Sequence, residues 1–203
     1  NPFYNYESTE ADEIGADGFN KRVDFKWYFE KNMGAGQYPN LIYITMGPND
    51  VEATYHWEYG FAETQARNIV TMCRKIKAAC DEIAGGESGV VIKFLTHQTY
   101  PLNTMYNYNF PIERQRNLWK YMYDAYYKAF KAEGISDWVE LVDCASRFDW
   151  RVGYTTQEVS YNARYAKSND NTFMSETCHM NRIGAYNYAD CLINDFIADE
   201  RFD

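Results

Sequence analysis

Two short stretches of this chain hold residue types that can stabilise negative charge and move protons. The first is Met46-Gly47-Pro48-Asn49-Asp50, which follows the apolar run 41–45. The side-chain amide of Asn49 can donate to a developing oxyanion, and Gly47 permits the tight turn that aims it. Such a donor lowers the barrier of acyl transfer by about 3–4 kcal/mol. The alternative is a turn in which Asn49 only caps the end of a strand.

The second stretch, Glu176-Thr177-Cys178-His179, places an acid three residues before a histidine. His179 can take a proton from a hydroxyl nucleophile, while Glu176 holds the imidazole in the required tautomer. The alternative is a histidine that packs before the last helix and bonds to a backbone carbonyl. Because both stretches lie where a sheet is expected to end, their combination favours one catalytic site.

An α/β scaffold is expected to position these residues. Continuous apolar runs predict strands at 41–46, 90–95 and 138–142, as in parallel strands covered on both faces. Helical periodicity or capping predicts helices at 24–32, 62–84, 113–132 and 181–197. Asp24 is placed to cap the first helix, and Gly85 and Gly86 to stop the second. A chain of 203 residues with this alternation predicts a single α/β domain, 1–203, with a parallel sheet.

Ligands of such sheets bind beyond the carboxyl ends of the strands. Besides Asn49, that edge should carry His97 after the second strand and Asp143 after the third. His97 and Tyr100 are candidates for a substrate wall. Alternatively, His97 is a polar surface residue and the aromatic loop 100–110 packs under the long helix. Asp143 is interpreted as structural, bonded to a loop amide.

The Gly-x-Asn-Asp and Glu-x-x-His motifs resemble two conserved blocks of the SGNH/GDSL hydrolase family. The resemblance extends over nearly the whole chain, including segments 24–29 and 162–186. It implies a flavodoxin-like, three-layer α/β/α sandwich that hydrolyses esters, thioesters or acetylated sugars without a metal or other cofactor. It also implies that Asn49 is the oxyanion donor, His179 the base and Glu176 its acidic partner.

Three departures from the family pattern concern the catalytic groups. Pro48 stands where small or hydroxylated residues are common, and Glu176 replaces the usual aspartate. No Gly-Asp-Ser precedes the first strand, and no serine follows a strand-to-helix elbow pattern. We therefore expect a missing N-terminal segment of the same protein to carry the serine and the first two strands. One of these strands would lie beside 41–46, because a bare apolar strand invites aggregation.

Composition excludes several other functions. The net charge is −9 and the basic residues are scattered, which argues against nucleic-acid binding. No apolar run reaches the roughly 18 residues of a membrane span. The three histidines form no metal-binding cluster. The five cysteines lack a C-x-x-C pair, so free, mostly buried thiols and a reducing compartment are favoured, although the compartment itself is not identified.

Two function hypotheses follow. The first is an SGNH-type serine esterase, most plausibly acting on acylated carbohydrate. The second is a catalytically inactive SGNH-like module that binds glycans or serves a larger assembly, such as a phage tail or cell-surface complex. The missing serine and an aromatic content of 18% favour the second, although aromatic residues more often fill cores and interfaces. A nucleotide-binding flavodoxin-like domain is opposed by the lack of a glycine-rich phosphate loop.

Overall fold

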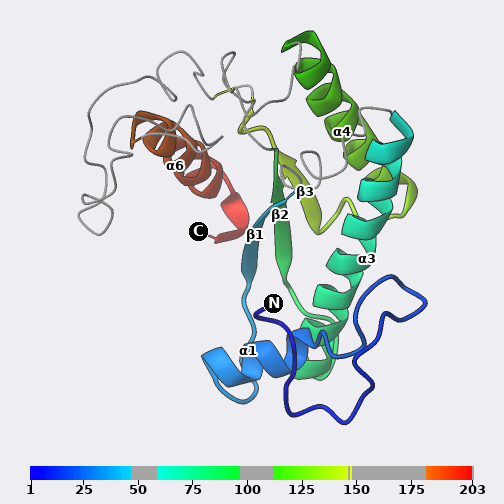
Figure 1. Cartoon of the computed structure of the whole chain (residues 1–203). Helices are drawn as coiled ribbons and strands as arrows, with labels where there is room; N and C mark the ends of the chain where they lie inside the picture. The colour runs from blue at the N-terminus through cyan, green and yellow to red at the C-terminus, as the bar shows by residue number, and fades with distance from the viewer. Residues whose placement is uncertain (47–58, 97–111, 146, 148–181, 203) are drawn as a thin grey trace, which may run out of the picture. The chain divides into compact units, whose positions relative to one another are not determined.

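The computed structural model describes residues 1–46, 59–96, 112–145, 147 and 182–202 (Figure 1). Along the chain the elements are α1 (Phe25–Met33), β1 (Leu41–Thr45), α3 (Tyr59–Ala84), β2 (Val91–Leu95), α4 (Ile112–Ala132), β3 (Val139–Val142), α6 (Arg182–Ile197) and the 3-10 helix η3 (Glu200–Phe202). Each strand and helix predicted from the sequence is therefore present, with bounds shifted by a few residues at most. None of the described helices combines the length and apolar character needed to cross a membrane.

The three strands form one parallel sheet in the order β1-β2-β3. The direction follows from two hydrogen bonds between β2 and β3. Ile92 N–H donates to the Trp138 carbonyl at 2.8 Å, and Thr96 N–H donates to the Val142 carbonyl at 2.9 Å. Both bonds join residues 46 positions apart (138 − 92 and 142 − 96), so the strands run in the same direction. This confirms the predicted α/β class, whereas the flavodoxin-like three-layer arrangement stays a prediction.

β2 is the central strand of the three, and all five of its residues are buried. β1 is only partly buried and pairs with β2 alone among the described strands. The continuous apolar pattern of 41–46 is typical of a central strand. A second strand beside β1, on the side away from β2, stays a prediction.

The chain divides into two compact units, whose boundary crosses every strand near its carboxyl end. The first unit comprises Asn1–Ile44, Glu58–Phe94 and Asp124–Leu141, and the second Thr45–Trp57, Leu95–Tyr123 and Val142–Asp203. The first unit thus holds most of the sheet with α1 and α3. The second holds the carboxyl ends of the strands together with α6.

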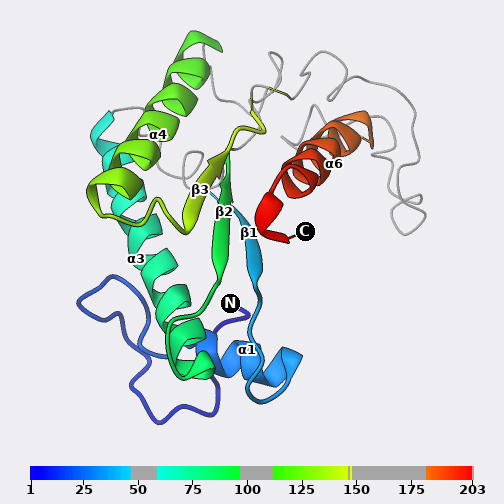
Figure 2. The same cartoon turned by 180° about the vertical axis from the view of Figure 1, so that it is seen from behind.

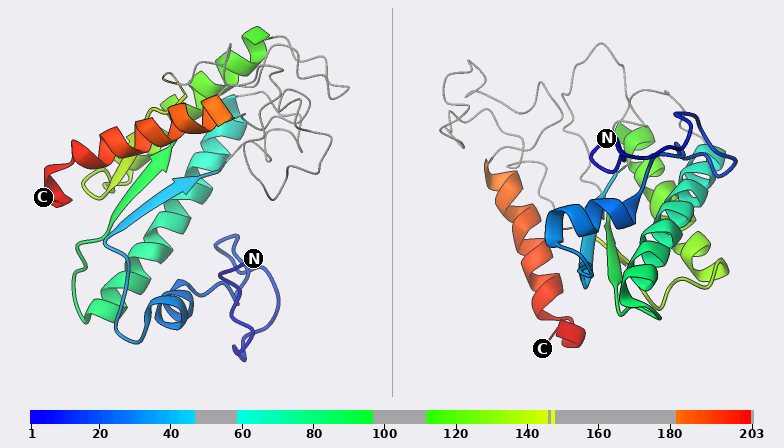
Figure 3. Two further views of the ribbon diagram at one scale, coloured as in Figure 1. Left: turned by 90° about the vertical axis from the view of Figure 1, so that its left-hand side faces the viewer. Right: turned by 90° about the horizontal axis from the view of Figure 1, so that it is seen from below.

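Aromatic packing forms the core of the first unit. Phe94 on β2 meets two rings of α4 edge-on, with centroids 5.0 Å from Tyr126 and 6.4 Å from Phe130. α3 lies beside the carboxyl-terminal half of α4 (Figures 2 and 3), where Arg74 pairs with Glu133 at 2.7 Å. The ring contacts confirm that the aromatic side chains of Phe94, Tyr126 and Phe130 fill a core.

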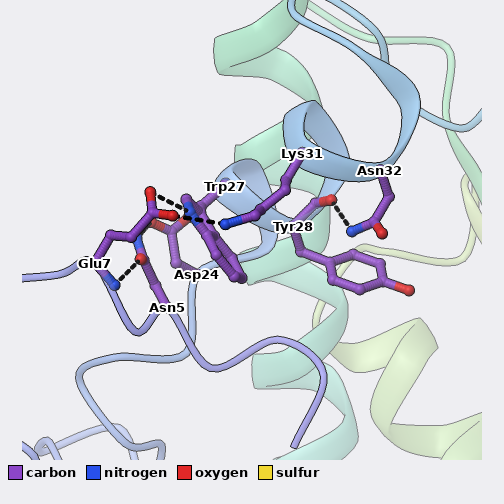
Figure 4. Close-up of polar contacts among 7 residues, drawn as sticks. All are labelled: Asn5, Glu7, Asp24, Trp27, Tyr28, Lys31 and Asn32. Carbon is purple, nitrogen blue, oxygen red and sulfur yellow. Dashed lines mark hydrogen bonds and ion pairs between the residues drawn. The ribbon is translucent and has the colours of Figure 1, made fainter.

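α1 begins where Asp24 caps it, as the sequence predicts. Asp24 Oδ1 accepts the Trp27 backbone N–H at 2.9 Å, and Oδ2 accepts the Asn5 side-chain amide at 3.1 Å. Figure 4 shows how Glu7 adds contacts to the same helix, at 2.6 Å from Lys31 Nζ and 3.3 Å from Trp27 Nε1. The irregular lead-in is therefore fastened to α1 through the cap residue.

Replacing Asp24 by alanine is expected to lower the free energy of unfolding by about 1–2 kcal/mol, because the helix loses its cap and Asn5 loses its acceptor. Urea denaturation followed by circular dichroism measures this. Asp137→Ala, in the exposed turn before β3, is the matched control and should change stability by less than about 0.5 kcal/mol. Equal effects of the two changes would contradict the capping role.

Asp81 at the end of α3 collects three donors on Oδ1: Lys77 Nζ at 2.6 Å, and Ser88 N–H and Oγ at 2.7 and 2.6 Å. Burial acts to raise the pKa of Asp81, but the hydrogen bonds from Lys77 and Ser88 outweigh it and lower that pKa. The ionised carboxylate therefore stabilises the fold.

A carboxyl whose pKa is lowered by folding stabilises the protein above its unfolded pKa of about 3.9 and loses that effect as pH falls through the folded value. Asp81→Asn should therefore destabilise the protein at pH 7 and lose less further stability than the wild type between pH 5 and pH 2. Urea unfolding across this pH range measures the difference. Glu87→Gln, at an exposed position nearby, is the control and should follow the wild-type curve.

Candidate functional site

All the residues predicted for the site lie outside the described residues: Gly47, Asn49, His97, Tyr100, Glu176 and His179. The structure instead describes the elements that flank them. These are the carboxyl ends of the three strands and α6, all of which belong to the second unit.

A hydrogen bond joins the end of β1 to α6. The Tyr188 hydroxyl donates to Thr45 Oγ1 at 3.4 Å, across 143 positions of sequence. Thr45 comes just before the Gly-x-Asn-Asp motif, and α6 begins at Arg182, just after the Glu-x-x-His motif. The strand that precedes the first motif and the helix that follows the second are therefore in contact within the second unit.

Tyr188 is half-buried, and the Cys144 thiol lies near enough to influence the pKa of its phenol. Burial raises the pKa of Tyr188 to about 12, while its bond to Thr45 acts in the opposite direction. The phenol is therefore uncharged at neutral pH. One neutral hydroxyl thus connects α6 with the end of β1.

The ends of β2 and β3 are fastened by Thr96, which is buried. Its hydroxyl lies 3.3 Å from the Val142 carbonyl and 3.2 Å from Asp143 Oδ1, and it accepts the Ala145 N–H at 3.0 Å. The Thr96 hydroxyl thus binds the loop amide of Ala145 and also contacts the Asp143 carboxylate. The predicted bond of Asp143 to a loop amide stays a prediction. Thr96 immediately precedes His97, so this network supports the chain where the predicted substrate wall begins.

A pair of thiols lies at the same end of β3. Cys144 Sγ and Cys191 Sγ are 3.1 Å apart and both residues are buried. Cys191 Sγ also contacts the Asp143 carbonyl at 3.8 Å. Burial raises the pKa of the Cys144 thiol well above its ordinary range. Sequence reasoning missed this pair, because the two cysteines are 47 positions apart and no short motif links them.

One polar side chain of α6 has an acceptor without a partner among the described residues. Asn187, next to Tyr188 on α6, has a side-chain oxygen that is shielded from solvent and finds no donor among the described residues. This acceptor can take a donor from a bound ligand or from another part of the chain. Within the described ranges, no group of three or more His, Cys, Asp or Glu side chains is placed to hold a metal ion.

Comparison with protein-family models, with curated proteins and with solved structures gave no match for this chain. The resemblance to SGNH hydrolases therefore depends on the two motifs and on the order of the elements around them. The α/β class with a parallel sheet stands independently, because the hydrogen bonds between the strands establish it.

Proposed function

We propose that this chain belongs to an SGNH-type ester hydrolase that acts on acylated carbohydrate or a similar ester. The observation that carries the proposal is the hydrogen bond between Tyr188 and Thr45, which joins the flanks of the two motifs within one unit. The motifs are remote in sequence and have complementary chemistry. α6 follows the Glu-x-x-His motif, and β1 precedes the Gly-x-Asn-Asp motif. A hydrogen bond between these two elements favours one site that both motifs share.

In this proposal each motif residue has one task. The Asn49 amide donates to the oxyanion that forms when the ester carbonyl is attacked. His179 takes the proton from the nucleophilic hydroxyl and returns it to the leaving alcohol. Glu176 holds the imidazole in the tautomer that leaves one ring nitrogen free to accept that proton.

The nucleophile is proposed to come from outside this sequence. Among the described residues the serines are Ser8, Ser88 and Ser136. No serine of the sequence, including Ser146, Ser160, Ser168 and Ser175 outside the described residues, follows a strand-to-helix elbow pattern. Ser88 is buried and its hydroxyl donates to Asp81 at 2.6 Å, so it has a structural role. A serine supplied by another segment of the protein would complete the triad.

The lack of a serine in the expected pattern favours the second candidate function, a binding module. A module that keeps the oxyanion and base motifs but has no serine would bind an acylated glycan without hydrolysing it. Uncharged hydroxyl and amide groups, such as those of Tyr188 and Asn187, are suited to hydrogen bonding with sugars.

Labelling of the full-length gene product with a fluorophosphonate probe separates the two candidates. An esterase is expected to label at one serine, to lose the label when preincubated with an acetylated oligosaccharide, and to release acetate from that compound. Absence of both labelling and acetate release, with retained binding of the oligosaccharide by calorimetry, would overturn the esterase proposal and support the binding module. Heat-denatured protein controls for non-specific labelling.

A further inference from the structure

We propose that Cys144 and Cys191 are a redox pair whose oxidation forms a disulfide that fastens α6 to the chain beyond β3. This goes beyond the proposed function. In the structure the four described cysteines are free and buried, as the sequence predicts, and the proposal concerns the oxidation of one pair. The two Sγ atoms are 3.1 Å apart, and both side chains are almost fully buried. A disulfide bond is about 2.05 Å long, so the atoms need to approach by only about 1 Å.

The other described cysteines show why this pair is selected. Cys73 and Cys80 are also buried, but both lie on α3, seven positions apart. That separation is about 10 Å along a helix, well beyond the span of a disulfide. Cys144 and Cys191 instead come from a strand end and a helix that are remote in sequence, which is the arrangement a cross-link can stabilise.

The position of α6 gives the cross-link a structural effect. Contacts between α6 and the strand ends include the Tyr188 bond to Thr45 at 3.4 Å, the Cys191 contact with the Asp143 carbonyl at 3.8 Å and the Cys144–Cys191 contact at 3.1 Å. Several large apolar side chains of α6 remain exposed, including Ile193 at 54% and Ile197 at 70%. Restricting a loop of 47 positions lowers the entropy of the unfolded chain and so stabilises the docked helix.

The oxidant is a low-molecular-weight disulfide such as oxidised glutathione. One cysteine thiolate attacks it, forms a mixed disulfide and releases the first glutathione thiolate. The second cysteine thiolate then attacks its neighbour's sulfur, which forms the Cys144–Cys191 bond and releases the second glutathione. The two protein thiols are oxidised by two electrons, the oxidant is reduced by two, and the two thiol protons end on the two glutathione molecules. Because both native cysteines are buried, we expect the reaction to be fastest during folding.

The test is refolding of the full-length protein in glutathione buffers of increasing oxidised-to-reduced ratio. Differential alkylation and peptide mass spectrometry should then find a cross-linked peptide pair containing Cys144 and Cys191, and a mass loss of about 2 Da. The Tm of the oxidised protein should exceed that of the reduced protein by about 10 °C.

Four single variants provide the controls. Cys144→Ala and Cys191→Ala should abolish both the cross-link and the Tm difference, whereas Cys73→Ala and Cys178→Ala should keep them. The wild-type measurement needs no variant to fold. The proposal is overturned if folded wild type, denatured in the presence of the alkylating reagent, shows both cysteines fully alkylated at every ratio, or if Cys191 is found linked to Cys178 instead.

Discussion

Replacing His179 by alanine is expected to lower kcat for ester hydrolysis by the full-length protein at least about 10³-fold, with KM nearly unchanged. In the proposed mechanism the histidine acts in the transition state, where it carries the proton of the nucleophile, and contributes little to ground-state binding. Initial rates with p-nitrophenyl acetate and with an acetylated oligosaccharide measure the change. Because the synthetic ester has a good leaving group, its rate should fall less than that of the sugar ester.

Two further variants sharpen this result. Asn49→Ala should lower kcat by about 10²–10³-fold, since one oxyanion donor is lost. His56→Ala controls for the loss of a histidine outside the motifs and should leave kcat unchanged. If the His179 and Asn49 variants are folded and retain wild-type kcat, the assignment of the site to these motifs is wrong, even if the protein is an esterase.

Replacing Phe94 by alanine is expected to lower the free energy of unfolding by about 3–5 kcal/mol. Phe94 is 1% exposed on the central strand and packs edge-on against Tyr126, 5.0 Å away between centroids. Truncation removes this contact and leaves a cavity between β2 and α4 that the strand cannot close. Urea denaturation measures the loss, which is large against a typical total stability of 5–15 kcal/mol.

Tyr127→Ala is the matched control for the core substitution. Tyr127 is also an aromatic residue of α4, but it is 54% exposed. Its truncation should therefore change the free energy of unfolding by no more than about 0.5 kcal/mol. Similar losses from Phe94→Ala and Tyr127→Ala would mean that the β2–α4 contact does not form the core described here.

The positions of helices and strands could be predicted because they depend on local patterns. The apolar period of α3 and its end at Gly85, which has a φ of 69°, are both encoded within a few turns. What could not be predicted depends on tertiary contacts. Lys93 lies within the predicted apolar strand, yet it is 2% exposed and reaches Glu140 on the neighbouring strand at 3.7 Å. Only the strand order shows that this partner is available.

The candidate site could be predicted only as two motifs and the elements beside them. Strand ends were expected to converge because parallel strands end at one edge of a sheet, and Thr96 bears this out for β2 and β3. The Tyr188–Thr45 bond and the Cys144–Cys191 contact are absent from the sequence analysis. Each joins α6 to a residue at or just beyond the end of a strand remote along the chain, and their residue types are common in ordinary cores.

The neutral hydroxyl bonds of Tyr188 and Thr96 affect how any activity should respond to solution conditions. Surface ion pairs weaken with added salt, and carboxylate or histidine contacts change as they titrate. A phenol whose pKa is about 12 and a threonine hydroxyl carry no charge across the neutral range, so their bonds do not titrate there and are not screened by salt. The Tyr188–Thr45 bond between α6 and the end of β1, and the bonds of the Thr96 hydroxyl to the Val142 carbonyl and the Ala145 amide, should therefore be insensitive to salt and to pH between about 5 and 9. A pH–rate profile in that window would then report the titration of the catalytic groups alone, because these bonds of Tyr188 and Thr96 do not change with pH.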